Sequence, residues 1–182
     1  IKFQNHITTK FPQLKDKKLL LAVSGGIDSM VLMHLFQQLN YDIAIAHCNF
    51  QLRGKESDAD ELFVKVKSEK LKVKSYFIRF DTENYSKENK LSIQLAARKL
   101  RYDWFQELLS ENQLDYLVTA HHLDDNVETF LINFVRGTGL EGLTGIPPQN
   151  GNIVRPMLPF SREEIENYAL ENKIQWREDL SN

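Results

Sequence analysis

One short segment holds the residue types that bind an anion, residues 24–29, which read Ser24-Gly25-Gly26-Ile27-Asp28-Ser29. The two glycines allow a sharp turn whose backbone N–H groups can point at phosphate oxygens, and the serines at either end add hydroxyl donors. Asp28 places a carboxylate beside these donors, and it would repel a phosphate unless a cation lay between them. A divalent ion bound with a polyphosphate removes that conflict, so this segment predicts a nucleotide together with Mg²⁺.

The flanking residues predict the elements that position this segment. Leu19 to Val23 form an uninterrupted apolar run, as in a strand buried on both faces, and Met30 to Leu39 resumes with apolar residues at helical spacing. A strand, a glycine turn and a helix start together present N–H groups to an anion. The alternative is an ordinary strand-to-helix turn, since Gly, Asp and Ser begin many helices. Neither G-x-x-x-x-G-K-[ST] nor G-x-G-x-x-G after a strand occurs here.

A second polar cluster, residues 121–128, follows the apolar run from Leu114 to Ala120 and reads His-His-Leu-Asp-Asp-Asn-Val-Glu. Asp125 and Glu128 are three positions apart, so they share a face of the helix that begins there and could bind metal or move a proton. The alternative is structural, with Asp125 as the helix cap and Glu128 folding back onto it. A zinc site built from the two histidines lacks the i, i+4 spacing of a helical pair.

Two arginines, Arg98 and Arg101, lie three positions apart on a long helix predicted from Leu91 to Leu108. They flank its apolar stripe instead of opposing it. Guanidinium groups at that place suit phosphate oxygens at the strand ends. The alternative is that both arginines only cover the edge of the helix.

Alternating strands and helices predict an α/β fold, a Rossmann-like and mostly parallel five-stranded sheet with helices on both faces. The expected strands are residues 19–23, 41–47, 73–80, 114–120 and 153–156. Functional groups of such sheets lie at the carboxyl ends of the strands, where both polar clusters fall.

The connecting segments carry further expectations. A helix over residues 57–70 is expected to bury Leu62 and Val66, and a helix after residue 121 carries the apolar stripe Val127, Phe130, Leu131 and Phe134. Residues 81–90 are expected to be a polar loop, and residues 136–152 a glycine-rich loop. Gly137 to Gly142 spell G-x-G-x-x-G, but they follow a helix, so a dinucleotide fingerprint is rejected there.

Composition bounds the class of protein. The 182 residues suit one α/β domain, and the chain is 42% hydrophobic and 26% charged, as in ordinary globular proteins. No apolar run approaches a membrane span and no signal peptide is evident, so a cytoplasmic location and no membrane partner are expected. Cys48 is the only cysteine, which excludes an internal disulfide and a Cys-rich metal site. The net charge of −2 argues against an extended nucleic-acid footprint on this chain.

Several segments, in order, resemble one family. The hexapeptide at residues 24–29 resembles the pyrophosphate loop of the PP-loop enzymes, the ATP pyrophosphatase superfamily. Residues 120–129 resemble the A-H-H-x-D-D-x-x-E-T motif of one family of this superfamily, the tRNA(Ile)-lysidine synthetases. Further likenesses to that family lie at residues 96–102 (A-A-R-x-x-R-Y), 176–182 (W-x-E-D-x-S-N) and 47–57 (H-x-N-H-x-L-R-x-x-S). The last departs at Phe50, where a histidine is common.

The resemblance implies an adenine nucleotide alpha hydrolase-like fold and a catalytic domain over residues 1–182, with further C-terminal tRNA-binding domains absent from this chain. It implies ATP-dependent ligation of free L-lysine to C2 of the wobble cytidine in tRNA(Ile) with a CAU anticodon. The C2 oxygen would attack the α-phosphate, pyrophosphate would leave, and the lysine ε-amine would then displace AMP. A homodimer is one arrangement compatible with the sequence.

The resemblance also assigns residues. Contact with ATP is implied for Ser24, Gly25, Gly26, Ile27, Asp28, Ser29, His47 and Arg101; catalytic roles for Asp28, Arg98, Asp125 and Glu128; and Mg²⁺ binding for Asp28 and Asp125. Lysine with a pKa of ~10.4 is neutral in only about one molecule in 2,500 at pH 7, so its amine must lose a proton, with Asp125 or Glu128 as acceptor.

Two other functions remain open from the sequence. One is another PP-loop ATP pyrophosphatase that modifies tRNA or forms an amide, although a single cysteine argues against sulfur transfer through paired thiols. The other is a non-catalytic regulatory module that binds a nucleotide.

Overall fold

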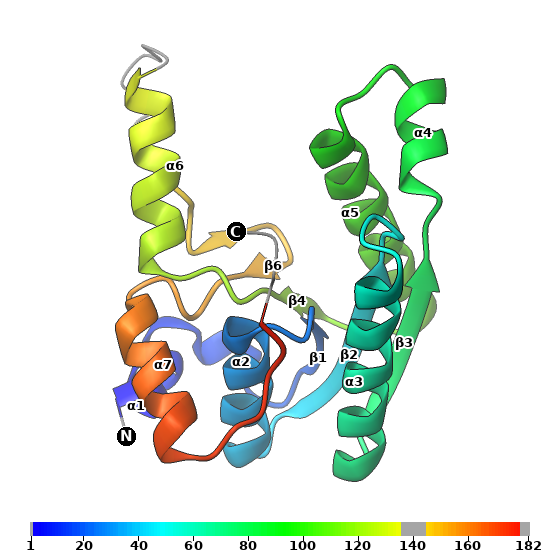
Figure 1. Ribbon diagram of the computed structural model, residues 1–182. Coiled ribbons are helices and arrows are strands. Elements are labelled where there is room, and N and C mark those ends of the chain that lie inside the picture. The colour runs from blue at the N-terminus through cyan, green and yellow to red at the C-terminus, as the bar shows by residue number, and fades with distance from the viewer. Residues whose placement is uncertain (1, 136–144, 179–182) are drawn as a thin grey trace.

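The computed structural model describes residues 2–135 and 145–178, and its centre is a six-stranded sheet in the order β3-β2-β1-β4-β6-β5 (Figure 1). Neighbouring strands are parallel except β5 and β6, which pair antiparallel. The strands are β1 (Lys18–Ala22), β2 (Asp42–Asn49), β3 (Lys74–Arg79), β4 (Tyr116–Val118), β5 (Gln149–Asn150) and β6 (Ile153–Val154). The α/β class and the mostly parallel sheet are therefore confirmed.

The predicted count of five strands is one too low, because β5 lies inside the segment expected to be loop. This two-residue strand turns back at Gly151, whose φ of 58° favours glycine, and pairs with β6 as a short hairpin. Residues 136–144 of the same predicted loop, including Gly137 to Gly142, lie outside the described residues.

Helices cover both faces of the sheet. They are α1 (Lys2–Lys10), α2 (Ile27–Gln38), α3 (Lys55–Leu71), α4 (Thr82–Glu88), α5 (Ile93–Glu111), α6 (Leu123–Val135) and α7 (Arg162–Glu171), with a short 3₁₀ helix at Pro12–Leu14. Alternate residues of β1 show the two layers. Leu19 and Leu21 pack with the core formed by α1, α2 and α7, whereas Leu20 packs with Phe105 of α5. Burial on both sides explains why this strand is uniformly apolar.

Two local expectations are wrong. Residues 82–88 form α4 instead of a loop, because the Asp81 side chain accepts a hydrogen bond from the Asn84 backbone N–H and caps the helix. In α3 it is Val64, only 1% exposed, that is buried, while Leu62 and Val66 are 62% and 51% exposed. Residues two positions from Val64 lie about 200° around the helix and therefore face solvent.

Helix α6 rises away from the sheet (Figure 1). Its predicted apolar stripe is exposed among the described residues, from 40% at Phe130 to 63% at Phe134. Within residues 2–135 and 145–178, no helix combines the length and the apolar character required to cross a bilayer.

Candidate functional site

The segment predicted to bind phosphate forms the turn between β1 and α2. Gly25 has a φ of 99°, a conformation that favours glycine, and Gly26 begins α2 without a side-chain cap. The Ser29 hydroxyl accepts hydrogen bonds from the backbone N–H groups of Ser24 and Gly25, both at 3.2 Å, and donates to the Gly26 carbonyl at 2.9 Å. Backbone N–H groups thus converge on one small polar centre at the start of a helix, as anion binding requires.

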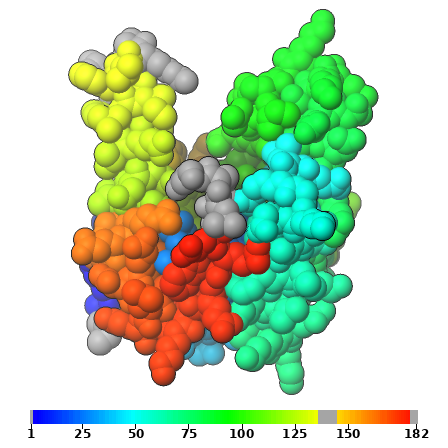
Figure 2. Space-filling model, in the orientation of Figure 1, coloured from blue at the N-terminus to red at the C-terminus, as the bar shows by residue number. Residues whose placement is uncertain are grey.

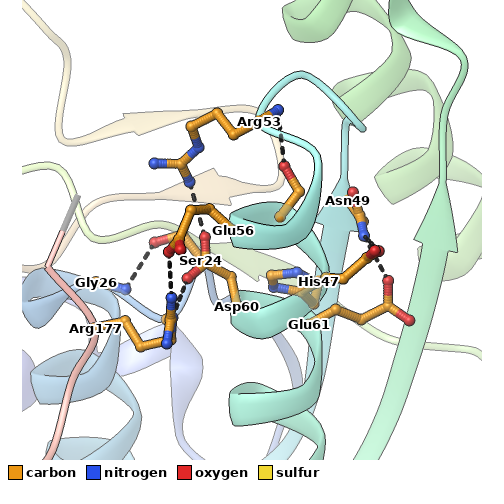
Figure 3. A network of polar contacts seen from close by, with 12 residues as sticks. Ser24, Gly26, His47, Asn49, Arg53, Glu56, Asp60, Glu61 and Arg177 are labelled. Carbon is orange, nitrogen blue, oxygen red and sulfur yellow. Dashed lines mark hydrogen bonds and ion pairs between the residues drawn. The ribbon is translucent and has the colours of Figure 1, made fainter. Parts of the chain in front are cut away.

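The turn is held from behind by α3 and by the chain end (Figure 3). The Arg177 backbone N–H donates to the Gly25 carbonyl at 2.9 Å, and its guanidinium binds Asp60 at 2.5 Å and Glu56 at 2.6 Å. A Cβ on Gly25 would lie 3.3 Å from the Val64 side chain. The glycine therefore serves both the turn conformation and the close approach of α3.

A cavity of about 350 Å³ opens in front of the turn, at the carboxyl ends of β1, β2 and β4. On the same edge of the molecule the surface is hollowed between α6 and the α4–α5 pair (Figure 2). Five of the predicted site residues line this cavity, namely Ser24, Asp28, Ser29, Arg101 and Asp125. The topology therefore joins the two polar clusters and the second arginine, which are far apart in the sequence.

His122 links the two clusters. Its buried imidazole Nε2 lies 3.6 Å from Asp28 Oδ1 and 3.5 Å from Asp125 Oδ2, and its Nδ1 lies 3.6 Å from Asp124. The His122 backbone N–H also donates to Asp125 Oδ2 at 2.8 Å, so Asp125 folds back over the first turn of α6. The alternative in which Asp125 is the cap and Glu128 folds back is wrong, because Asp125 itself occupies the third helical position.

Asp28 is a carboxylate whose pKa is raised by its surroundings. Burial raises its pKa, and the nearby Asp125 charge adds to this, while His122 and Arg162 act in the opposite direction. Its Oδ1 is buried without a hydrogen-bond partner among the described residues. A cation would satisfy such an oxygen.

The same part of the chain holds no group of three or more His, Cys, Asp or Glu placed to bind a metal on its own. Mg²⁺ differs from zinc in this respect, since it is commonly held by one or two carboxylates together with substrate phosphates. Asp28, with its unpaired oxygen, and Asp125 fit that mode of binding.

The remaining predicted residues lie elsewhere. Arg98 lines a neighbouring cavity, with its guanidinium 5.0 Å from the centre of the Tyr102 ring. His47 is buried and donates from Nδ1 to the Val23 carbonyl at 2.8 Å, so it supports the end of β1. Burial lowers the pKa of His47. Glu128 is exposed on α6 and does not line the 350 Å³ cavity. Ile27 is 5% exposed and packs into the core.

Several residues at the site escaped the sequence reasoning. His122 was in a recognised motif, yet only the fold reveals that it lies between the aspartates. Burial and the charges of three arginines lower the pKa of His121, whose Nδ1 lies 2.8 Å from the Thr119 hydroxyl. Arg162 approaches Asp28 at 4.0 Å from α7, and only its place at a helix start could have drawn attention to it.

Fold and site together define a doubly wound α/β domain with a glycine turn, of the kind that suits an anion, at the carboxyl edge of its sheet. The family described as "PP-loop domain" matches residues 1–182, the whole chain. The chain belongs to that family.

Curated relatives share one name, tRNA(Ile)-lysidine synthase. The Porphyromonas gingivalis protein is 45% identical over all of this chain and 41% of its own length. The Bacteroides thetaiotaomicron protein is 48% identical over 85% of this chain and 36% of its own length. The Chlorobaculum tepidum protein is 49% identical over 90% of this chain and 50% of its own length. The chain thus spans half or less of the length of these relatives.

Solved structures support the fold alone. The U34-tRNA thiolase NcsA from Methanococcus maripaludis, solved with its [4Fe-4S] cluster, superposes with a TM-score of 0.78 at 16% identity, over 97% of this chain and 65% of that one. The NH3-dependent NAD synthetase from Campylobacter jejuni gives a TM-score of 0.65 at 16% identity, and the match covers 96% of this chain and 72% of that one.

Proposed function

We propose that this chain is the catalytic part of a tRNA(Ile)-lysidine synthase, which uses ATP to join lysine to the wobble cytidine of tRNA(Ile). The observation that carries the proposal is one cavity, lined by Ser24 and Ser29 of the glycine turn together with Asp28 and Asp125, in a chain 45% identical over its full length to a protein of that name. Activity, substrates and partners all belong to this proposal.

ATP would place its β- and γ-phosphates against the turn at residues 24–29, because the N–H groups and hydroxyls gather there. Arg101 lines the same cavity and could neutralise phosphate charge. The cytosine C2 oxygen then attacks the α-phosphate and pyrophosphate leaves. Mg²⁺ bound at Asp28 and Asp125 would offset the charge that develops on the leaving group.

The second stage needs a proton acceptor for the lysine ε-amine. Asp125 lines the cavity, whereas Glu128 lies outside it, so Asp125 is the better placed of the two predicted bases. After the amine attacks C2, AMP departs as the leaving group. A positioned base of this kind contributes ~10²–10⁴-fold to rate.

The test is formation of AMP and pyrophosphate by the full-length protein with a tRNA(Ile) transcript, with and without lysine. We expect pyrophosphate release that depends on the RNA, and lysidine in the digested RNA only when lysine is present. RNA-dependent pyrophosphate release with no change to the cytidine would replace lysidine synthesis by another PP-loop reaction. Nucleotide binding without pyrophosphate release would favour the regulatory module.

A thiolase reaction is disfavoured by the single cysteine. Cys48 lines the cavity, but burial raises its pKa to about 12, so it remains a thiol at neutral pH. The net charge of −2 fits a division of labour in which parts of the protein beyond this chain bind most of the tRNA. Cytoplasmic location, a homodimer and those additional tRNA-binding domains are further predictions of the same proposal.

A further inference from the structure

A second cavity, of about 500 Å³, lies between α5 and the β5–β6 hairpin. Tyr102 lines both this cavity and the one in front of the glycine turn, so the two are neighbours that share one aromatic wall. The lining of the second cavity includes Leu95, Arg98, Lys99, Tyr102, Ile153 and Arg155. A group bound here would lie directly beside the proposed reaction centre.

Arg155 is the unusual residue of this second cavity. It is only 6% exposed, and its guanidinium donates one hydrogen bond, to the Pro147 carbonyl at 2.8 Å. Its Nε has no partner among the described residues. A buried cation whose donors are only partly satisfied carries a large desolvation cost, which an anionic ligand would offset.

The charged residues that line the second cavity are all basic, namely Arg98, Lys99 and Arg155. The Lys99 ammonium is paired with Asp103 at 2.7 Å, but Asp103 itself is not part of the lining. A free amino acid would bring an ammonium group as well as a carboxylate, and the lining offers nothing acidic to receive it. The phosphodiester of a nucleic acid is anionic without that cationic partner, and it suits a guanidinium fork.

The walls of the cavity are fixed to each other and suit a nucleotide. Gln106 of α5 and Asn152 of the hairpin exchange side-chain amide hydrogen bonds at 3.1 and 3.3 Å. Leu95 and Ile153 supply apolar surface, and the Arg98 guanidinium, 5.0 Å from the centre of the Tyr102 ring, offers a flat cationic group on which a base can stack. Because the amide pair ties α5 to the hairpin, the cavity needs little rearrangement to accept a ligand.

We infer that this second cavity holds the RNA next to the reacting cytidine, and that Arg155 binds a phosphodiester flanking that nucleotide. The inference rests on the proposed function, because it takes the acceptor to be RNA. The flanking phosphate would be fixed in the cavity on one side of Tyr102, while the reacting cytosine would reach the ATP bound in the cavity on the other side.

The experiment measures binding of an anticodon stem-loop RNA with a CAU loop to the full-length protein, by fluorescence anisotropy without ATP or lysine. Each phosphate flanking the target cytidine is replaced in turn by a neutral methylphosphonate. In the unaltered protein, we expect one replacement to weaken binding about tenfold. Arg155→Met should weaken binding to the native RNA similarly and be insensitive to that replacement, since the contact is already lost.

Salt dependence gives an independent measure. Loss of one phosphate contact should reduce the slope of log K against log salt by ~0.7 in Arg155→Met. Lys99→Met, an exposed position lining the same cavity, tests the site without altering a buried residue and should also reduce the slope. Lys70→Met, exposed near the end of α3, is the matched control and should leave it unchanged.

Equal sensitivity of the unaltered protein and Arg155→Met to every methylphosphonate would overturn the inference, as would the absence of any sensitive phosphate in the unaltered protein. Weaker ATP binding with unchanged RNA binding in Arg155→Met would do the same, because the arginine would then serve the nucleotide. The proposed function fails separately, if the protein binds the RNA through Arg155 yet forms no lysidine.

Discussion

His122 Nε2 lies 3.6 Å from Asp28 Oδ1, which joins the residue directly before α6 to the first turn of α2. The imidazole also approaches Asp125, so one buried ring lies between the two carboxylates that we assign to Mg²⁺ and proton transfer. This contact makes the two polar clusters a single site. Changes at either cluster should therefore impair the same overall reaction, at the pyrophosphate-forming step for Asp28 and at the lysine-dependent step for Asp125.

Asp28→Asn should lower the rate of pyrophosphate formation by about 10²-fold or more, because the amide keeps the shape but cannot neutralise a cation. The measurement is RNA-dependent AMP formation at saturating Mg²⁺ and ATP. A variant with at least half of the parent rate would remove Asp28 from the proposed chemistry.

The same substitution should leave the fold as stable as before or more stable at pH 7. Burial raises the Asp28 pKa above its ordinary value of 3.8, so its favourable contribution to stability is present below that value and is lost as the pH rises through the folded-state pKa. The thermal midpoint of Asp28→Asn should equal or exceed that of the parent at pH 7, with the difference closing near pH 4. A lower midpoint at pH 7 would contradict this.

Asp125→Asn and Glu128→Gln should separate the two predicted bases. Because Asp125 lines the cavity, Asp125→Asn should slow the lysine-dependent step by ~10²–10⁴-fold. The amide oxygen can still accept the hydrogen bond from the His122 backbone N–H, so the start of α6 should be preserved. Glu128→Gln should cost much less. Single-turnover transfer from the adenylated RNA to lysine measures both, and a reversed order would reassign the base.

Arg177→Met should loosen the glycine turn, since the guanidinium contacts with Asp60 and Glu56 hold the segment that donates to the Gly25 carbonyl. We expect a several-fold higher KM for ATP and a stability loss below about 1 kcal/mol, because the ion pairs are partly exposed. Lys67→Met is the control, because Lys67 bonds Gln175 of the same segment but does not contact the turn. Equal KM changes in both variants would count against a specific role for Arg177.

Cys48 should resist thiol reagents in the native protein. Its pKa of about 12 leaves almost no thiolate at pH 8, and the side chain is only partly exposed, within the 350 Å³ cavity. We expect reaction with a disulfide reagent to be at least about 100-fold slower than in urea, where the thiol is exposed and its pKa returns to normal. Rapid modification of the folded protein would refute the assigned environment.

The sequence by itself determined the class of fold and the position of the glycine turn between β1 and α2. Both depend on local patterns, namely a uniformly apolar strand, two glycines and a resumed helical period, which act over a few residues. The start of α7 depends on an equally local pattern, since Ser161 and Glu164 form a capping box there. Sequence reasoning failed at α4, because one side-chain cap from Asp81 was enough to fold a polar segment into a helix.

Tertiary structure alone decided which of the polar residues meet. Strand order brings Asp28 and Asp125 to one cavity through the pairing of β1 with β4. The faces of α5 and α6 on which Arg98 and Glu128 lie place Arg98 in the neighbouring cavity and Glu128 outside both cavities. Tertiary structure also placed His122 between the aspartates and left Arg155 buried without a full set of partners. Such distances depend on contacts between segments remote in the chain, and no local spacing encodes them.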